Sequence, residues 1–497
     1  MSTLPEAAAV PGKASARIPG PRSGARRPLP QSPSRLDPHR LRRRVRAVAF
    51  GPWPPAAVFA AIYGVDSVRR YTQFRTTSWD LGLFTEAVKQ YAHLHAPIAD
   101  ARAPGFNLLG EHFHPILALL APFFAIKPSP ITLLLAQAVL FASSIVPVTS
   151  LARERLGARS GHVVGAAYGA SFGIVQAVDF DFHELAFAAP LIALALLALL
   201  RDRERLLIVA CVGLLCTKEE FGVTVVLPLG IAWALRDRAR WRRRLPLAAC
   251  GVLVSALQVF WLIPELNPSH VYGFLSDTGT VGSAGNAEGI GLFFAAVGGK
   301  LYLLFLLGLA TGFAALLSPL TLLAVPDLVM RFASSDSSYW GTLYHYNAVL
   351  MPVLFIAAID GLARHRVRVR RLGVAAIGLA ALMLLPGYGF GQILTAQQHA
   401  PSALHVQALR DAIHEVPAGA SVETDISALA PLAAKADVFW SGNAAIDPAA
   451  QYVVYDTVAA DEPLTPSQVV QLVEAWHPLA LYELISSEDG VDVLREA

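Results

Sequence analysis

The chain has few charged residues. Asp, Glu, Lys and Arg together make up 15% of its 497 residues, whereas an average soluble domain has roughly 25%. That leaves too little polar surface to solvate a globule of this size. Long apolar runs recur instead from about Arg46 to Phe390, and a membrane-spanning helix needs about 20 mainly apolar residues. The sequence therefore predicts that a lipid bilayer surrounds most of the chain.

Other classes of protein are excluded by what is missing. Cysteine is scarce, and Cys211, Cys216 and Cys250 lie within or beside apolar runs, so we expect no disulfide framework. No basic region with interleaved aromatic residues is present, so we predict no nucleic-acid partner. No apolar core follows the first charges closely, which argues against a signal peptide. Residues 1–45 have instead the Pro, Ser, Ala and Arg content of a disordered cytoplasmic tail.

Apolar segments predict a transmembrane domain over residues 46–390. The candidate membrane helices cover residues 48–66, 130–151, 161–178, 184–200, 205–217, 221–235, 246–263, 300–317, 319–332, 347–363 and 372–389. A further run that begins at His114 has two internal prolines, and we interpret it as a re-entrant or interfacial segment. The predicted fold class is an all-α polytopic membrane protein with about 11 transmembrane helices.

Arginine clusters predict the orientation, because short loops rich in Lys and Arg stay in the cytoplasm. Five clusters fall on one side of the predicted spans, at residues 40–46, 153–159, 201–205, 236–244 and 364–371. The four loops that we assign to the other side, between residues 179 and 346, contain Lys218 as their one Lys or Arg. An odd number of crossings follows, with the N-terminus in the cytoplasm and the C-terminus outside.

The end of the chain differs from the rest in composition. After about Gly391 the sequence becomes mixed and polar, and QYVVYD at residues 451–456 alternates like a strand. Residues 391–497 are therefore predicted to form a small soluble α/β unit outside the membrane.

Polar groups gather on the predicted outer side, although ionisable side chains near a bilayer cost about 2.5–3.5 kcal/mol each on insertion scales. Asp80 and Glu86 lie in TTSWDLGLFTEAV, which is predicted to form a helix in the membrane interface. The other groups are GEHFHP with His112 and His114, DFDFHE with Asp179, Asp181, His183 and Glu184, TKEEF with Lys218, Glu219 and Glu220, and YHYN with Tyr344 and His345. If each polar group had its own unrelated structural role, such groups would occur on both sides of the membrane. Their gathering on one side therefore predicts one functional site.

The DFDFHE segment suggests metal binding. If its backbone is extended, Asp179, Asp181 and His183 point one way and the two phenylalanines the other. Carboxylates and imidazoles are ligands for divalent cations such as Mg, Mn or Zn. Asp179, Asp181, His183 and Glu184 are therefore the candidate metal ligands.

Each polar group also has a purely structural interpretation. Asp80 could cap the interfacial helix, and the two histidines of GEHFHP could be ordinary interfacial residues. Asp179 and Glu184 could be solvated loop residues. Lys218 could form an ion pair with Glu219 or Glu220, which says little about function. Tyr344 and Tyr346 could belong to the aromatic belt of the membrane.

The order of these motifs resembles that of a bacterial membrane-protein family, domain of unknown function 2079. The motifs are WDLGLF, EHFHPILALLAPF, LLLAQA, DFHE, TKEEF and YHYNAVLMPVLF, between about Tyr71 and Gly361, and the tail with VPAGASV and QYVVYD resembles the family's C-terminal extension. The family is similar in layout to the glycosyltransferase C (GT-C) superfamily. Enzymes of that superfamily transfer a sugar from a polyprenyl-phosphate carrier to an acceptor on the outer side of the membrane.

The resemblance implies a multi-pass protein of the bacterial inner membrane, with membrane lipids and a polyprenyl-phosphate-linked sugar as partners. An acidic residue in the first outer loop is typically catalytic in such enzymes, and the matching position is Asp80, with Glu86 as a second candidate. The plain DD or DE pair of the best-known members is missing from that loop. A divalent metal is often involved, and Asp181 with His183 would be its natural site.

Positive charge is needed near the departing phosphate, and Lys218 is a cationic candidate for that contact. The full set of residues predicted to bind substrate or phosphate is Lys218, Glu219, Glu220, His112, His114, Tyr344 and His345.

Two other functions stay open at this point. A transporter or flippase would place ionisable groups near the membrane midplane, on broken helices related by a repeat. A non-catalytic sensor or scaffold would use the C-terminal unit to bind a partner. An enzyme predicts one outer cavity lined by Asp80, His114, Asp181, His183 and Lys218, whereas a scaffold predicts that these residues are scattered.

Overall fold

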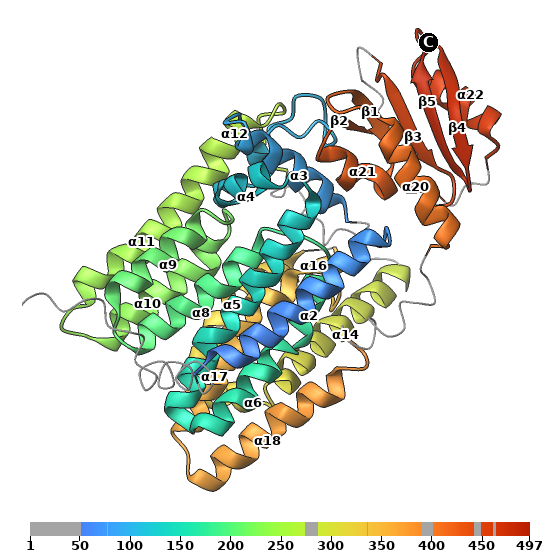
Figure 1. Ribbon diagram of the computed structural model, residues 1–497. Coiled ribbons are helices and arrows are strands. Elements are labelled where there is room, and N and C mark those ends of the chain that lie inside the picture. Colours follow the sequence, from blue (N-terminus) through green and yellow to red (C-terminus); the bar gives the residue numbers. More distant parts are fainter. Residues whose placement is uncertain are drawn as a thin grey trace, which may run out of the picture. The chain divides into compact units, whose positions relative to one another are not determined.

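The computed structural model describes most of the chain (Figure 1). The described residues are 51–76, 78–273, 287–334, 336–388, 401–441, 449–460 and 464–497. The predicted cytoplasmic tail, residues 1–45, lies outside them, as do residues 391–400 at the start of the predicted C-terminal unit.

The predicted membrane domain is helical throughout its described part. Its α-helices are α2 (Trp53–Thr72), α3 (Trp79–Ala92), α4 (Ala121–Ile126), α5 (Pro130–Leu156), α6 (Ala158–Gly169), α7 (Phe172–Asp179), α8 (Leu185–Leu200), α9 (Glu204–Leu215), α10 (Leu227–Arg236), α11 (Trp241–Leu257), α12 (Ile263–Leu266), α14 (Ala287–Ala310), α15 (Val325–Ala333), α16 (Ser337–Trp340), α17 (Leu350–Ala363) and α18 (Val367–Leu384). Short 3-10 helices extend or connect them at η1 (Leu108–Gly110), η2 (Pro115–Leu120), η5 (Ala314–Leu317), η6 (Pro319–Ala324) and η7 (Tyr346–Val349). Short π-helices do so at η3 (Gly222–Val226) and η4 (Gln258–Leu262).

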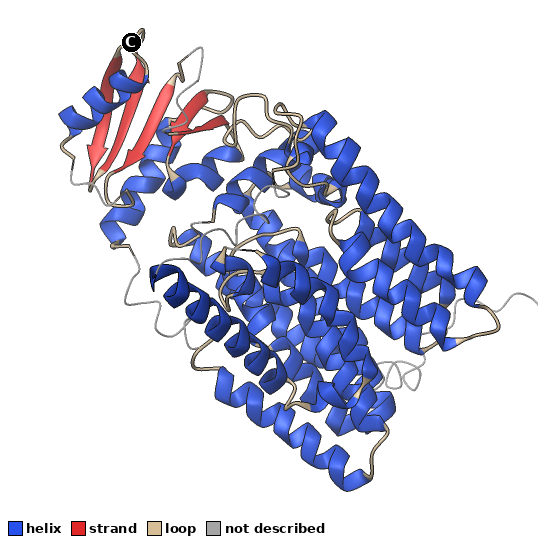
Figure 2. Ribbon diagram, turned by 180° about the vertical axis from the view of Figure 1, so that it is seen from behind, coloured by secondary structure: helices blue, strands red, loops and turns tan. Residues whose placement is uncertain are grey.

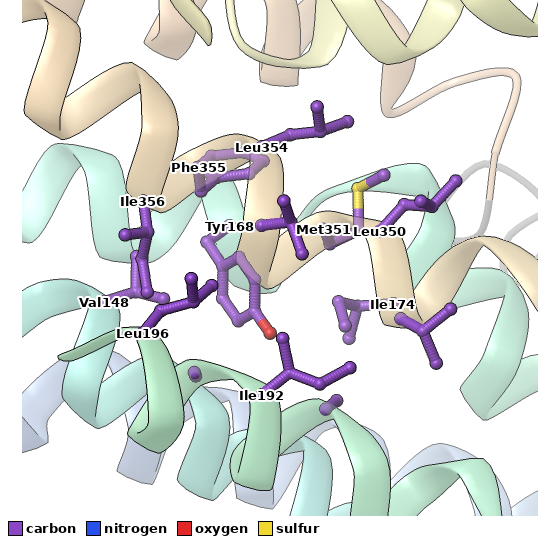
Figure 3. Packing of buried hydrophobic residues seen from close by; sticks show 14 of the residues in the cluster. Val148, Tyr168, Ile174, Ile192, Leu196, Leu350, Met351, Leu354, Phe355 and Ile356 are labelled. Carbon is purple, nitrogen blue, oxygen red and sulfur yellow. The ribbon is translucent and has the colours of Figure 1, made fainter. Parts of the chain in front are cut away.

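Helix α5 lies at the centre of the bundle and packs against α2, α6, α8 and α17. Its start is set by Ser129, whose side chain accepts a hydrogen bond from the backbone N–H of Ile131, and by Pro130 in the first turn. It ends at Gly157, whose φ of 101° suits glycine. The core beside it is apolar and close-packed, with Tyr168 against Phe355 at a ring distance of 5.3 Å (Figure 3).

Three described helices are long and apolar enough to cross a membrane, namely Pro130–Leu156, Trp241–Leu266 and Tyr346–Ala363. Shorter apolar helices are Pro115–Ile126, Leu185–Leu200, Gly222–Arg236 and Ala296–Ala310. The chain thus has a polytopic helical character, and the count of 11 crossings stays a prediction.

One predicted span forms two short helices. The predicted span 161–178 is divided into α6 and α7, because Ser171 between them has an extended backbone with φ −66° and ψ 142°. The run from His114 forms one short helical segment, in which η2 passes directly into α4. Its re-entrant or interfacial placement stays a prediction.

The C-terminal part contains a five-stranded sheet, whose strands are red in Figure 2. Their order is β2-β1-β3-β5-β4, with the labels of Figure 1. Its elements are α20 (Ala403–Glu415), β1 (Ser421–Thr424), α21 (Ile426–Ala433), β2 (Asp437–Trp440), β3 (Tyr452–Asp456), α22 (Pro466–Trp476), β4 (Tyr482–Glu488) and β5 (Val491–Glu496). Strand β1 is parallel to β2 and β3, whereas β5 is antiparallel to β3 and β4. The prediction of an α/β unit with a strand at QYVVYD is confirmed.

The sheet unit packs on α3. The rings of Trp79 and Trp440 meet edge to face at 4.6 Å, and Lys89 Nζ lies 2.6 Å from the carbonyl oxygen of Ala436. Gly82 makes this packing possible, because a Cβ at that position would lie 2.5 Å from the Leu429 side chain. Helix α3 and the C-terminal unit therefore lie on one side of the membrane, which requires an even number of crossings between them.

Candidate functional site

Asp80 lies in the first turn of α3 and points at His183. The helix is capped by Ser78, whose Oγ accepts a hydrogen bond from the Leu81 backbone N–H at 3.2 Å, so the cap does not depend on Asp80. Asp80 Oδ2 lies 3.8 Å from His183 Nε2, and 26% of the Asp80 side chain is exposed. Burial, followed by the charge of Glu184, raises the pKa of Asp80 to about 7.

His183 stacks on His345. Their ring centroids lie 3.5 Å apart, and the ring planes differ by 21°. Asp80, His183 and His345 each offer one ligand atom, and these three atoms lie within 4.8 Å of one another. Both ring nitrogens of His345 are buried without a hydrogen-bond partner among the described residues. These three residues are the group in the described part of the chain that could hold a metal ion.

The loop with His183 is held by Gln137 of α5. The Gln137 side chain accepts a hydrogen bond from the His183 backbone N–H at 3.0 Å and donates to the backbone oxygens of Ala177 and Asp181. The alternation of DFDFHE suggested an extended backbone, but the loop is not extended. Asp179 ends α7, and Asp181 has a left-handed backbone with φ 75°, which aspartate tolerates better than most residues.

Arg70 neutralises two of the predicted metal ligands. Its NH1 lies 3.0 Å from Asp179 Oδ1, and its NH2 lies 3.3 Å from Asp181 Oδ1. Asp181 Oδ2 also accepts a hydrogen bond from the Ser78 backbone N–H at 3.1 Å. Of the four predicted ligands, His183 belongs to the possible metal group, while these two aspartates join α2 to the start of α3. Sequence reasoning missed Arg70, although it follows the first predicted span by four residues.

Lys218 extends the site away from the histidines. Its Nζ lies 3.9 Å from Glu184 Oε1 and 4.0 Å from Glu220 Oε2. Glu184 is fully buried, and its Oε2 lies 3.0 Å from His183 Nδ1. A continuous row of charged and polar groups thus runs from Asp80 through His183 and Glu184 to Lys218.

Glu219 faces another set of partners. It accepts hydrogen bonds from His112 Nδ1 at 2.6 Å, from the Phe113 backbone N–H at 3.0 Å and from the Tyr272 hydroxyl at 2.7 Å. These bonds fix the GEHFHP loop to the start of the TKEEF segment. They give Glu219 and His112 a positioning role that sequence spacing could not reveal.

Three predicted site residues lie around this row. His114 is buried and meets the Phe84 ring edge to face at 5.5 Å. Tyr344 is 40% exposed and packs against Phe180. Glu86 is buried on α3 and accepts a hydrogen bond from the Ala101 backbone N–H at 3.2 Å. Burial raises the pKa of Glu86 to about 8, so it is mostly protonated at neutral pH.

A cavity of about 520 Å³ adjoins Lys218. Polar lining residues are Lys218, Glu219, Glu220, His112, Thr224, Ser255, Tyr272, Ser334 and Tyr339, and apolar ones are Val223, Val259, Pro326, Val329 and Met330. The cavity expected from the sequence was to contain Asp80 and His183 as well. The structure instead places those two residues beside one another, joined to Lys218 through Glu184.

Arg331 is a further cation that the sequence did not single out. It is buried, and its NH1 lies 3.5 Å from Asp327 Oδ2. It donates a hydrogen bond to Asn347 Oδ1 at 2.9 Å, close behind His345 in the chain. The i, i+4 spacing of Asp327 and Arg331 inside an apolar run was the available signal.

Comparison with solved structures identifies the fold. The crystal structure of ArnT from Cupriavidus metallidurans bound to undecaprenyl phosphate is 14% identical, with a TM-score of 0.57, over 88% of this chain and 97% of that chain. ArnT in the apo state, from the same organism, is 13% identical, with a TM-score of 0.48, over 88% of this chain and 98% of that chain. The first of these likenesses shows that this chain has an ArnT-like fold.

Comparison with proteins of curated function finds no match. The family described as "Predicted membrane protein (DUF2079)" matches residues 70–493. This match includes every residue of the site described above and all of the sheet except the last three residues of β5. Because it spans well over half of the 497 residues, the chain belongs to the DUF2079 family of predicted membrane proteins.

Proposed function

We propose that this protein is a GT-C-type membrane glycosyltransferase that moves a sugar from a polyprenyl-phosphate carrier to an acceptor at the outer face of the bacterial inner membrane. The observation that most supports this function is the row of groups from Asp80 to Lys218 beside a partly apolar cavity. It offers a carboxylate, a cation and a space for an amphiphile at one end of the bundle. The ArnT-like fold and the family membership agree with this assignment.

Asp80 is the proposed general base. In the transfer, a bond forms between the acceptor oxygen and the anomeric carbon of the sugar, while the bond from that carbon to the phosphate oxygen breaks. The acceptor proton passes to Asp80, and the polyprenyl phosphate leaves with the electron pair. A base works best when its pKa is close to the working pH, and the pKa of Asp80 is about 7. Glu86 fits this role less well because it is buried and its carboxylate accepts a hydrogen bond from the Ala101 backbone N–H.

Lys218 is the proposed phosphate contact. Charge develops on the departing phosphate, and a fixed cation in a site that excludes water stabilises it. The Lys218 side chain is 6% exposed and lies at the polar end of the 520 Å³ cavity. Val223, Val259 and Met330 give the cavity an apolar wall against which a polyprenyl chain could lie. Undecaprenyl phosphate, an amphiphile of this kind, is bound in the ArnT structure that shares the fold.

A divalent metal fits the group of Asp80, His183 and His345. The two imidazoles favour zinc over magnesium, and they could hold the ion while the Asp80 carboxylate stays free to take the proton. The fit rests on the buried nitrogens of His345, which have no hydrogen-bond partner among the described residues. Such an ion would supply positive charge for a phosphate or sugar oxygen. His183 and His345 would hold it, and Gln137 would fix the loop that positions His183.

Replacement of His345 tests the metal proposal without an activity assay. The purified full-length protein should retain about one zinc ion per chain after dialysis, and His345→Ala should weaken its zinc affinity by at least roughly tenfold. His114→Ala is the matched control, because His114 is also a buried histidine but lies against Phe84. Equal zinc content in wild type and His345→Ala would refute the site.

Deletion of the gene in the source bacterium tests the function. We expect the deletion strain to lose one sugar modification from its envelope glycans and to accumulate one polyprenyl-phosphate-linked sugar, because the donor is no longer consumed. Mass spectrometry of glycans and of lipid extracts measures both. An unchanged glycan profile with an unchanged lipid-linked pool would contradict the proposal.

A further inference from the structure

A second cavity, of about 910 Å³, lies at the other end of the bundle. Its wall comes from the segments that connect α8 to α9 and α10 to α11, with the end of α8. Helix α8 begins just after His183 and ends at Leu200, and α9 returns from Glu204 toward Lys218. The two cavities are thus separated by the length of these helices, about 24 Å for the 16 residues of α8.

Arginine dominates the wall of this second cavity. The six arginines are Arg201, Arg203, Arg205, Arg236, Arg240 and Arg244, and the three carboxylates are Asp202, Glu204 and Asp237. Segments rich in arginine are expected on the cytoplasmic side of any inner-membrane protein. That rule accounts for the number of arginines, but not for their convergence on one concave site.

Each carboxylate of the wall forms an ion pair with at least one arginine, and Asp237 also lies 3.9 Å from Arg244 NH2. Arg236 Nε lies 3.2 Å from Asp202 Oδ1, and Arg244 NH2 lies 3.1 Å from Glu204 Oε1. The third pair joins Arg240 Nε to Asp237 Oδ2 at 3.5 Å. Arg201 reaches out of the wall, to Glu154 at 2.8 Å.

Two arginines keep their charge uncompensated. Arg203 and Arg205 are exposed, and neither forms an ion pair with any residue that the structure describes. The cavity therefore has a net positive charge after all its internal pairs are counted.

Arg244 is held in place in the wall of the cavity. Its side chain is 6% exposed, its NH1 donates to the Trp233 carbonyl oxygen at 3.3 Å, and its guanidinium lies 5.1 Å from the centre of the Trp233 ring. These contacts fix the guanidinium in the wall of the cavity, so its charge is already in place for an anion.

We propose that this cavity binds a phosphate-bearing anion, with the headgroup of an anionic phospholipid of the adjacent leaflet as its main source. Phosphate oxygens suit arginine because its guanidinium donates two parallel hydrogen bonds. Apolar side chains are exposed on the three helices that flank the cavity, at Val209 of α9, Leu235 of α10 and Leu245 of α11, and acyl chains would lie against these helices. Basic pockets between membrane helices are a known form of anionic-lipid site. This site does not depend on the proposed glycosyl transfer.

The test compares lipid binding by native mass spectrometry on the full-length protein in detergent. Phosphatidylglycerol and phosphatidylcholine are titrated separately, and inorganic phosphate is added as a competitor. Wild type should bind phosphatidylglycerol more tightly than phosphatidylcholine. Each arginine near an anionic surface changes binding by about fivefold, so the double variant Arg203→Gln/Arg205→Gln should bind phosphatidylglycerol roughly 25-fold more weakly.

Arg366→Gln/Arg368→Gln is the matched control, because these two arginines are also exposed and belong to an arginine cluster outside the cavity wall. Unchanged binding in this control supports a specific site. Competition by inorganic phosphate also supports an anion site. Binding of phosphate without any preference between the lipids supports an anion site too, but it means that the ligand is a soluble phosphate compound. Equal weakening in both double variants, or no preference of wild type for any phosphate-bearing anion, would overturn the proposal.

Discussion

Asp80→Asn should lower the rate of sugar transfer by about 10²- to 10⁴-fold, the usual contribution of a general base. Asparagine keeps the size and shape of the side chain but cannot take the acceptor proton. Membrane vesicles from the deletion strain hold the accumulated donor, so adding back purified wild-type or variant protein gives a direct assay of product formation. The melting temperature should stay close to that of wild type, because Asp80 does not cap α3.

Glu86→Gln is the control for this variant. Glu86 is a second carboxylate on α3, and glutamine can still accept the hydrogen bond from the Ala101 backbone N–H. Transfer should therefore continue in Glu86→Gln. Near-normal transfer in Asp80→Asn would rule out Asp80 as the general base. Loss of zinc together with activity would instead assign Asp80 as a metal ligand.

Lys218→Gln should lower transfer by about 10²- to 10³-fold, the typical loss when one fixed donor to a developing anion is removed. It should also destabilise the protein, because it leaves the carboxylate of Glu184 buried without its cation. A single variant therefore cannot separate a role in catalysis from a role in stability.

The double variant Lys218→Gln/Glu184→Gln separates them. Removing both charges should restore much of the melting temperature, since the fully buried carboxylate is gone and Glu220, which also loses its cation, is 20% exposed. It should not restore transfer. Glu184→Gln alone is the reference for the effect of the second substitution. Recovery of transfer together with stability would show that Lys218 is only part of a structural ion pair.

Local pattern was enough to predict several elements. TTSWDLGLFTEAV forms α3 with Asp80 in its first turn, and QYVVYD forms β3. Both follow from periodicity and capping, which act over a few residues. The gathering of Asp80, His183 and Lys218 at one end of the bundle followed from counting polar residues on each side of the predicted spans.

Partners that are distant in the sequence could not be predicted in this way. Arg70 binds Asp179 and Asp181, which lie more than 100 residues later, and so converts two apparent metal ligands into ion-paired residues. His345 was predicted to bind substrate or phosphate, and that stays a prediction; its stacking on His183 could not be read from the sequence. Such pairings depend on how the helices pack in three dimensions, and a single sequence does not contain that information.

The packing of the sheet unit on α3 has a consequence for biogenesis. Lys89 and the Ala436 carbonyl that accepts its hydrogen bond are separated by 347 residues. At a synthesis rate of 5–20 residues per second, roughly 20 to 70 s pass between the appearance of the two partners. During that interval α3 has no sheet to cover its apolar face, and a nascent chain cut short before residue 440 never acquires one. The packing of α3 is therefore completed only late in synthesis, after the C-terminal unit has been made.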